Sequence, residues 1–214
     1  MIALIFMKEN SERIPQKNYK LLNGKPLCHW ILEECESVDK ITKIVINTDS
    51  EKIANLCKKF SKVVIQKRSM YASNVQENEA NILLEEMISA FPSDQYINLH
   101  STSPMLSKKT IVKAIEWFER NGFDSMFSVT KHKARFYDAQ NLPINHELNK
   151  LIKTQDLNEI YEENSAFYIF SNNFYKKNKM RISSESKYFT IPKIEAFDID
   201  YIEDWEIVEK LMKY

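Results

Sequence analysis

Met1-Ile-Ala-Leu-Ile-Phe-Met7 opens the chain, and the polar loop Lys8-Glu-Asn-Ser-Glu-Arg13-Ile-Pro-Gln-Lys17-Asn18 follows it. A continuous apolar run of this length is typical of a parallel strand that is buried on both faces. In an α/β protein, the loop that leaves the carboxyl end of the first strand is a usual place for a ligand. The cations of this loop suit a polyanion such as a nucleoside triphosphate. A solvated surface loop would carry the same charges, so the stretch alone leaves both interpretations open.

The composition indicates one packed domain without an obvious nucleic-acid or membrane role. Of the 214 residues, 43% are hydrophobic and 28% are charged, which suffices for a substantial core. Lys plus Arg and Asp plus Glu both number 30, and this balance argues against non-specific nucleic-acid binding. No apolar run approaches the roughly 18 residues of a membrane span, and the first run is too short for a signal peptide. We therefore expect a cytoplasmic protein.

Cysteine and glycine usage narrows the chemistry further. The three cysteines have no CxxC spacing, so we expect reduced thiols and no structural disulfide. The chain has only two glycines, Gly24 and Gly122, and no GxxxxGK[ST] or GxGxxG motif. A phosphate group must therefore be held by side chains and by the backbone of other residues.

The hydrophobic pattern alternates between strand and helix periods. It predicts further strands at residues 41–47, 62–66, 95–99, 125–130, 165–170 and 188–191, and helices at residues 26–37, 50–60, 79–91, 108–120 and 203–212. Residues 67–78 show no clean period and are interpreted as a loop. This order predicts a single doubly wound, Rossmann-like α/β domain over residues 1–214, with a mostly parallel sheet.

Residues 131–163 interrupt this pattern. The segment is polar, has no strong helical stripe and includes Pro143. Long segments of this kind in compact domains are usually functional or interfacial. We predict a protruding insert that serves as a lid or as a dimerisation element.

Three segments follow predicted strands: the loop 8–18, the turn His100-Ser-Thr-Ser-Pro104 and Asp198-Ile-Asp200. The carboxyl ends of strands in an open parallel sheet share one rim, so we expect these segments to converge. In an extended Asp-x-Asp, both carboxylates lie on one face and suit Mg²⁺. The alternative is that Asp198 or Asp200 caps the last helix.

Five motifs occur in order along the chain. They are Lys8-x-x-Ser11-x-Arg13-Ile-Pro-x-Lys17-Asn18 with Leu-x-Gly24-Lys-Pro-Leu27, Val45-Ile-Asn-Thr-Asp49, Thr102-Ser-Pro104, Asn164-Ser-Ala-Phe-Tyr168 and Asp198-Ile-Asp200. Together they resemble the acylneuraminate cytidylyltransferases, the CMP-sialic acid synthetases, with the CMP-Kdo synthetases as more distant relatives. Each motif is weakly specific, but five in family order span nearly the whole chain.

The resemblance implies a nucleotidyltransferase that uses CTP and Mg²⁺ to activate an acidic sugar for surface glycan biosynthesis. By resemblance, Arg13, Lys17 and Asp200 are catalytic, and Asp198 and Asp200 bind the metal. The same comparison assigns nucleotide binding to Lys8, Ser11, Arg13, Lys17, Asn18, Arg68 and Asn78, and substrate binding to His100, Ser101, Gln155, Asn164 and Ser165. The family also suggests a homodimer.

This sequence departs from the family pattern at three points. Met7-Lys8 replaces the usual Ala-Arg, His100-Ser101 replaces Gln-Pro, and Ser165 replaces a Gly. A lysine keeps the charge of an arginine but not its bidentate fork. The change at His100 leaves the acceptor open. Another acid such as a phosphonate, or GTP in place of CTP, stays an alternative, as does a non-catalytic nucleotide-binding subunit.

Overall fold

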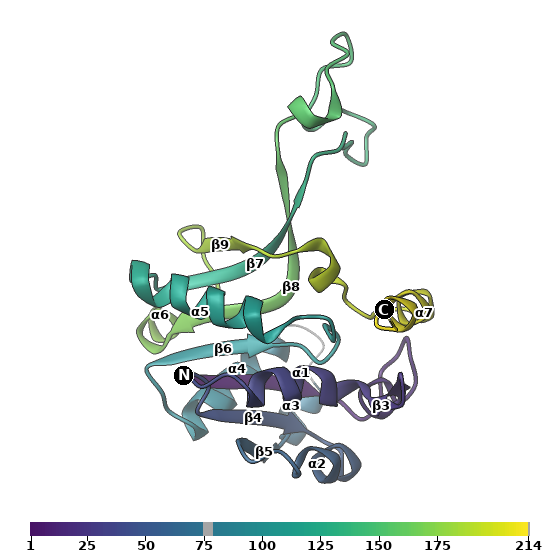
Figure 1. The fold of residues 1–214 in the computed structure, drawn as a ribbon. Helices are drawn as coiled ribbons and strands as arrows, with labels where there is room; N and C mark the ends of the chain where they lie inside the picture. Colours follow the sequence, from purple (N-terminus) through teal and green to yellow (C-terminus); the bar gives the residue numbers. More distant parts are fainter. Residues whose placement is uncertain (75–78, 214) are drawn as a thin grey trace.

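The sheet has seven strands in the order β5-β4-β1-β6-β8-β7-β9 (Figure 1). The computed structural model describes residues 1–74 and 79–213. The strands are β1 (Ile2–Met7), β4 (Lys43–Thr48), β5 (Val63–Lys67), β6 (Gln95–Leu99), β7 (Ser125–His132), β8 (Ile160–Ser171) and β9 (Lys187–Thr190). All neighbouring pairs are parallel except those that β8 makes with β6 and β7. The prediction of an α/β fold with a mostly parallel sheet is confirmed.

Strand β1 lies at the centre because both of its faces are apolar. Ala3, Ile5 and Met7 pack into one core cluster, and Ile2 and Leu4 pack into a second cluster on the opposite face. Burial on both faces explains why the strand shows a continuous apolar run and no alternation.

Helices cover both faces of the sheet. The helices are α1 (Leu27–Glu36), α2 (Glu51–Cys57), α3 (Met70–Asn74), α4 (Glu79–Ala90), α5 (Lys108–Asn121), α6 (Asn172–Asn178) and α7 (Ile202–Leu211). Residues of α1, α2 and α5 join the first core cluster, whereas α4 and α6 join the second. Local side-chain and backbone features determine where these helices begin and end. The Ser50 side chain accepts a hydrogen bond from the Ile53 N–H at the start of α2, and Gly122 ends α5 in the left-handed region at φ 61°.

Three predicted elements need correction. Residues 67–78 were interpreted as a loop, but they contain the short helix α3. The strand predicted at 165–170 begins earlier, at Ile160, and runs antiparallel to its neighbours. Asp198 does not follow a strand, because Lys193–Ala196 form a 3-10 helix.

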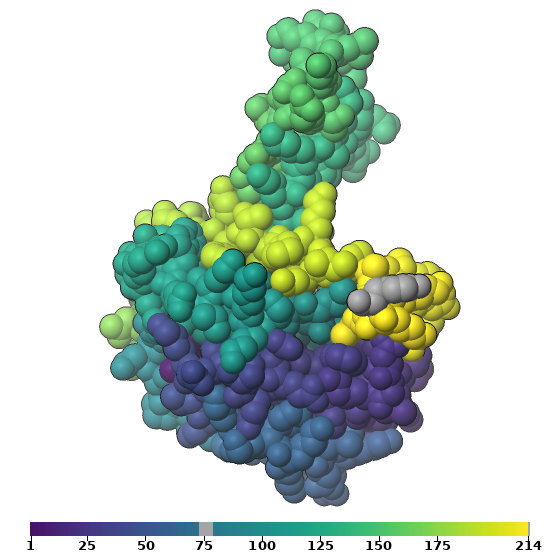
Figure 2. Space-filling view, in the orientation of Figure 1, coloured from purple at the N-terminus to yellow at the C-terminus, as the bar shows by residue number. Residues whose placement is uncertain are grey.

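The segment between β7 and β8 extends away from the sheet (Figures 1 and 2). Its stem pairs Lys131 with Tyr161 and His132 with Ile160, and residues 133–159, called the arm below, continue beyond the stem. Leu142, Ile144, Leu148 and Leu151 on the arm are exposed, Leu151 by 96%. A lid or dimerisation role for the arm stays a prediction.

The three cysteines, Cys28, Cys35 and Cys57, are free and buried, as the sequence predicts. Within residues 1–74 and 79–213, no helix is long and apolar enough to cross a membrane.

Candidate functional site

Lys17 fixes the loop after β1 against the C-terminal part of the chain. It starts a short 3-10 helix, Lys17–Tyr19, and its side chain is only 9% exposed. The Lys17 Nζ donates a hydrogen bond of 2.7 Å to the backbone oxygen of Ile199 and lies 3.5 Å from Asp200 Oδ1. Ile14, in the same loop, packs with Ile199 and Trp205 in a third apolar cluster. These contacts hold a cation beside a carboxylate without a glycine-built loop.

Arg13 approaches the same carboxylate from the solvent side. Its Nη1 lies 2.9 Å from Asp200 Oδ2, and its guanidinium lies 5.0 Å from the centre of the Tyr201 ring. The Tyr201 hydroxyl and the Asp200 carboxylate raise the pKa of Arg13. Asp200 therefore has two cationic neighbours, one buried and one exposed.

The three predicted segments converge. The Ser101 Oγ donates to Asn18 Oδ1 at 2.6 Å, the Asn18 Nδ2 donates to the Lys8 carbonyl at 2.8 Å, and the Ile199 N–H donates to the Thr102 carbonyl at 2.8 Å. A cavity of about 350 Å³, called the cationic cavity below, lies between the loop 8–18 and the turn that begins at His100. Its lining residues are Phe6, Lys8, Asn10, Ser11, Glu12, Arg13, Lys17, Asn18, His100, Ser101 and Thr102.

Neither predicted metal ligand caps the last helix. The Asp204 carboxylate accepts hydrogen bonds from the N–H groups of Asp200 (3.0 Å) and Tyr201 (2.7 Å), so the capping alternative for Asp198 and Asp200 is wrong. Asp198 Oδ1 is buried and has no hydrogen-bond partner among the described residues. Burial raises the pKa of Asp198. A cation beside this orphaned oxygen would remove the desolvation cost.

Mg²⁺ fits this donor set. The described ranges contain no cluster of three or more His, Cys, Asp or Glu side chains that would form a closed metal cage. Mg²⁺ is commonly held by one or two carboxylates, with water and substrate phosphate oxygens completing its shell. Asp198 and Asp200 can supply those carboxylates next to the cationic cavity.

His100 forms the inner wall of the cavity. Its ring lies edge-on to Phe6 and Tyr168, with ring centres 6.4 Å and 6.3 Å away. Its Nε2 is buried and makes no hydrogen bond within residues 1–74 and 79–213. Burial and the nearby Arg181 guanidinium lower the pKa of His100 to about 4. The imidazole is therefore neutral at pH 7.

Asn164 and Ser165 line a second cavity, of about 480 Å³, which we call the Asn164 cavity. Asn164 Oδ1 accepts from the Ser128 Oγ at 2.6 Å, and its Nδ2 donates to Thr130 Oγ1 at 3.0 Å, so both amide atoms are used within the protein. Ser165 has a positive φ of 56°, a conformation that explains why a glycine is common there in the resembled family. Asp198 also lines this cavity, so it adjoins the proposed metal ligands.

The sequence did not single out His132 and Glu162 as site residues. His132 Nε2 lies 2.8 Å from Glu162 Oε2, and both side chains line the Asn164 cavity. The two residues lie on neighbouring antiparallel strands, and the pairing of those strands was not predicted. No motif at either position signals this proximity.

Two other predicted residues, Arg68 and Gln155, line neither cavity. Arg68 has a side chain that is 1% exposed and donates to Asn47 Oδ1 and Glu79 Oε1, both at 3.0 Å, so it is bound within the protein. Gln155 lies on the arm, where its carbonyl accepts from Lys133, and the structure does not bring it to the site of this chain. Asn78 lies outside the described residues.

Comparisons with known proteins identify the relatives of this chain. A family model described as cytidylyltransferase matches residues 2–214. The chain is 30% identical to the CMP-N,N'-diacetyllegionaminic acid synthase of Legionella pneumophila, over 100% of this chain and 96% of the relative. It is 27% identical to the N-acylneuraminate cytidylyltransferase A of Danio rerio, over 97% of this chain, and it spans only 50% of that longer relative.

Solved structures share the fold. The chain aligns with the CMP:2-keto-3-deoxy-manno-octonic acid synthetase complexed with CTP at a TM-score of 0.73 and 14% identity, over 99% of this chain and 98% of that one. A 4-diphosphocytidyl-2C-methyl-D-erythritol synthase from Anaerococcus prevotii aligns at a TM-score of 0.70 and 12% identity, over 100% and 98% of the two chains. At these identities the likeness concerns the fold alone.

Proposed function

Because this chain belongs to the cytidylyltransferase family, we propose that it transfers CMP from CTP to a nonulosonic acid and releases pyrophosphate, with Mg²⁺ as its metal. The observation that carries this proposal is the pairing of Lys17 and Arg13 with Asp200 at the rim of the cationic cavity. Transfer of this kind needs cations around a polyphosphate and carboxylates that hold a metal beside it.

The reaction follows from this arrangement. An acceptor hydroxyl attacks the α-phosphorus of CTP in line, and pyrophosphate leaves. Lys17 and Arg13 bind the phosphate oxygens and offset the charge that develops on them. Asp198 and Asp200 would hold Mg²⁺, which neutralises phosphate charge when it is bound. Because Lys17 is fixed by Ile199, its ammonium is already in place before the nucleotide binds.

The acceptor class rests on the relatives. The Legionella pneumophila relative is named for legionaminic acid, and a Campylobacter jejuni relative, 25% identical over 99% of this chain, is a pseudaminic acid cytidylyltransferase. We assign the acceptor to the Asn164 cavity, where it would contact Ser165, with His100 and Ser101 at the boundary with the nucleotide. The activated sugar would serve a bacterial surface glycan.

A second copy of this chain is the proposed partner of the arm. Four apolar side chains of the arm are exposed by 59% to 96%: Leu142, Ile144, Leu148 and Leu151. Exposed apolar groups of this density mark interaction sites. A homodimer in which the arms meet would cover them.

A pyrophosphate-release assay tests the function. CTP, GTP, ATP and UTP are each combined with neuraminic, legionaminic and pseudaminic acids and with a phosphonate, with and without Mg²⁺. We expect release with CTP, one or more of the nonulosonic acids and Mg²⁺. Release with GTP or the phosphonate instead would select the alternative substrates, and no release in any combination would favour a non-catalytic nucleotide-binding protein.

A further inference from the structure

Lys193 is the cation of the Asn164 cavity that has no partner among residues 1–74 and 79–213. Five ionisable side chains line this cavity: His132, Glu162, Glu163, Lys193 and Asp198. His132 pairs with Glu162, and Glu163 accepts a hydrogen bond from the Tyr168 hydroxyl. Asp198 is a proposed metal ligand. The Lys193 ammonium makes no hydrogen bond or ion pair within the described ranges, so its charge is available to a ligand.

The backbone is fixed on both sides of this lysine. Before it, the buried Ile191 donates a hydrogen bond of 3.0 Å from its N–H to the Val129 carbonyl of β7. After it, the Glu195 carboxylate accepts from the N–H and the hydroxyl of Ser107 at 3.0 Å and 3.1 Å. The short 3-10 helix that Lys193 starts is therefore held between β7 and the start of α5, while the Lys193 side chain is exposed.

The same segment leads to a proposed metal ligand. The chain leaves β9, passes through this 3-10 helix and continues to α7 (Figure 1). Asp198 follows Lys193 by five residues, and both side chains line the Asn164 cavity. The next residue, Ile199, donates from its N–H to the carbonyl of Thr102, which lines the cationic cavity. A molecule in the Asn164 cavity would therefore meet an unpaired cation and a proposed metal ligand in one wall.

An acidic sugar suits this combination of charges. The ring form of a nonulosonic acid carries its carboxylate and the attacking hydroxyl on the same carbon, so a group that holds the carboxylate also limits where the hydroxyl lies. The three carboxylates of the cavity lining would repel an acid that met no positive charge. An ammonium on a flexible stem has three donors and can follow the carboxylate of differently substituted acids.

We propose that Lys193 binds the carboxylate of the acceptor and thereby selects acidic sugars over uncharged ones. Lys17 and Arg13 are assigned to the triphosphate in the cationic cavity, so the two anionic substrates have separate cations. The inference rests on the proposed function and names a specificity-determining residue for it.

The test compares Lys193→Gln with wild-type protein on paired acceptors. Neuraminic, legionaminic and pseudaminic acids are each supplied as the free acid and as the carboxamide, which keeps the shape of the carboxylate but not its charge. The kcat and KM for pyrophosphate release are measured for each acceptor with CTP and Mg²⁺. For a carboxamide that releases too little pyrophosphate, its inhibition constant against the matching acid takes the place of KM.

We expect wild-type protein to have a KM for the acid about 10-fold or more below that for the carboxamide, because a hydrogen bond to a charged group contributes on this scale. Lys193→Gln should raise the KM for the acid about 10-fold and leave the KM for the carboxamide, the KM for CTP and kcat within about twofold. Lys193→Arg keeps the charge and should restore most of the preference for the acid.

Lys187→Gln is the matched control. Lys187 is an exposed lysine at the start of β9, six residues before Lys193, and it lines a different cavity. This substitution removes the same charge and should keep the wild-type KM for every acceptor.

The two proposals can fail separately. An unchanged KM for the acid in Lys193→Gln overturns the role of Lys193, and so does an equal rise for acid and carboxamide, which would reflect the shape of the cavity. The same loss in Lys187→Gln would reflect overall charge and also overturns that role. In each of these cases wild-type turnover leaves the proposed function intact. Wild-type protein that releases no pyrophosphate from CTP with any of the acids overturns the proposed function and this inference with it.

Discussion

Replacing His100 by glutamine should make the stability of the protein less sensitive to acid. The folded state lowers the pKa of His100 to about 4, because the ring is buried and Arg181 lies nearby, while Asp200 acts in the opposite direction. An unfolded histidine has a pKa of about 6.5. Between these values the unfolded chain binds a proton that the folded chain does not. The folded state therefore loses stability as the pH falls below about 6.5, and the loss is complete near pH 4.

The size of this effect follows from the shift. One pKa unit corresponds to about 1.36 kcal/mol, so a fall from about 6.5 to about 4 amounts to roughly 3 kcal/mol of unfolding free energy. Between pH 7 and pH 5 the His100 contribution alone is about 2 kcal/mol. His100 Nε2 makes no hydrogen bond with the described residues, so glutamine removes the titration without removing a bond at that atom.

Urea unfolding at pH 5, 6 and 7, followed by circular dichroism with chelator present, measures the effect. The wild-type free energy of unfolding minus that of His100→Gln should fall by about 2 kcal/mol from pH 7 to pH 5. Titration of His29, whose pKa burial also lowers, cancels in this difference because both proteins retain it. A difference that stays constant to within about 0.5 kcal/mol over this range would refute the reasoning.

Three further predictions concern the site and the arm. Lys17→Met should reduce turnover in the pyrophosphate assay by about 10²–10³-fold, and unchanged turnover would exclude the catalytic role. It should also lower the free energy of unfolding by about 1–3 kcal/mol, since the Ile199 carbonyl loses its buried donor. Asp200→Asn should abolish Mg²⁺-dependent release, and normal release would contradict the metal assignment. Urea stability should change by less than about 1 kcal/mol, because the pair with Arg13 is exposed and the buried Lys17 keeps its hydrogen bond to the Ile199 carbonyl. Residues 134–158 can be replaced by Asn-Gly, a turn suited to the β7–β8 stem. In sedimentation equilibrium the shortened chain should be a monomer and the full chain a dimer. The same oligomeric state for both proteins would refute the role of the arm.

Most strands and helices could be predicted from the sequence because the hydrophobic pattern and the residues at the element ends indicate the same elements that the fold buries. The apolar run of β1 and the caps at Ser50 and Gly122 each identify an element boundary from neighbouring residues. Helix α3 was missed because it has only five residues and no apolar stripe of its own. The Ser69 hydroxyl accepts from the Ala72 N–H and donates to Glu86 of α4, so this short helix is held by a contact across the fold.

The direction of β8 was not predictable from hydrophobicity. Tyr168 and Phe170 would be buried whether the strand ran parallel or antiparallel to β6. The hairpin stem decides the direction, because the chain returns from the arm beside β7. That reversal pairs Glu162 with Thr130 and brings its side chain to 2.8 Å from His132, and so sets the composition of the Asn164 cavity. Errors in strand direction therefore become errors in the list of site residues.

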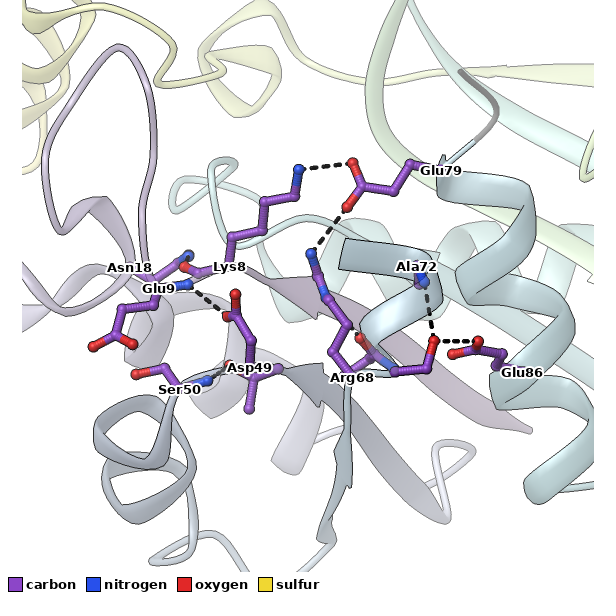
Figure 3. Close-up of polar contacts among 12 residues, drawn as sticks. Lys8, Glu9, Asn18, Asp49, Ser50, Arg68, Ala72, Glu79 and Glu86 are labelled. Atoms are coloured by element: carbon purple, nitrogen blue, oxygen red, sulfur yellow. Dashed lines mark hydrogen bonds and ion pairs between the residues drawn. The ribbon is translucent and has the colours of Figure 1, made fainter. Parts of the chain in front are cut away.

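The contacts of Glu79 with Lys8 and Arg68 (Figure 3) were missed for a related reason. The helix dipole stabilises an acidic residue in the first turn of a helix, so the position of Glu79 in the sequence can be explained without any other partner. Only the folded chain shows that its carboxylate lies between Lys8 and Arg68. Arg68 was singled out by resemblance, yet its own guanidinium is buried, and the exposed atoms beside it belong to its partners.

Lys17 shows how the fold and the proposed chemistry depend on one contact. With two glycines in the chain, the loop after β1 has no glycine-built backbone to surround phosphate. Its cation is fixed instead by the Ile199 carbonyl, and Ile199 is held by an apolar cluster that includes Ile14 and Trp205. The N-terminal loop and the Asp198–Asp200 segment therefore position each other. Helix α7, through Trp205 in this cluster, therefore helps to position the two segments that meet at the site.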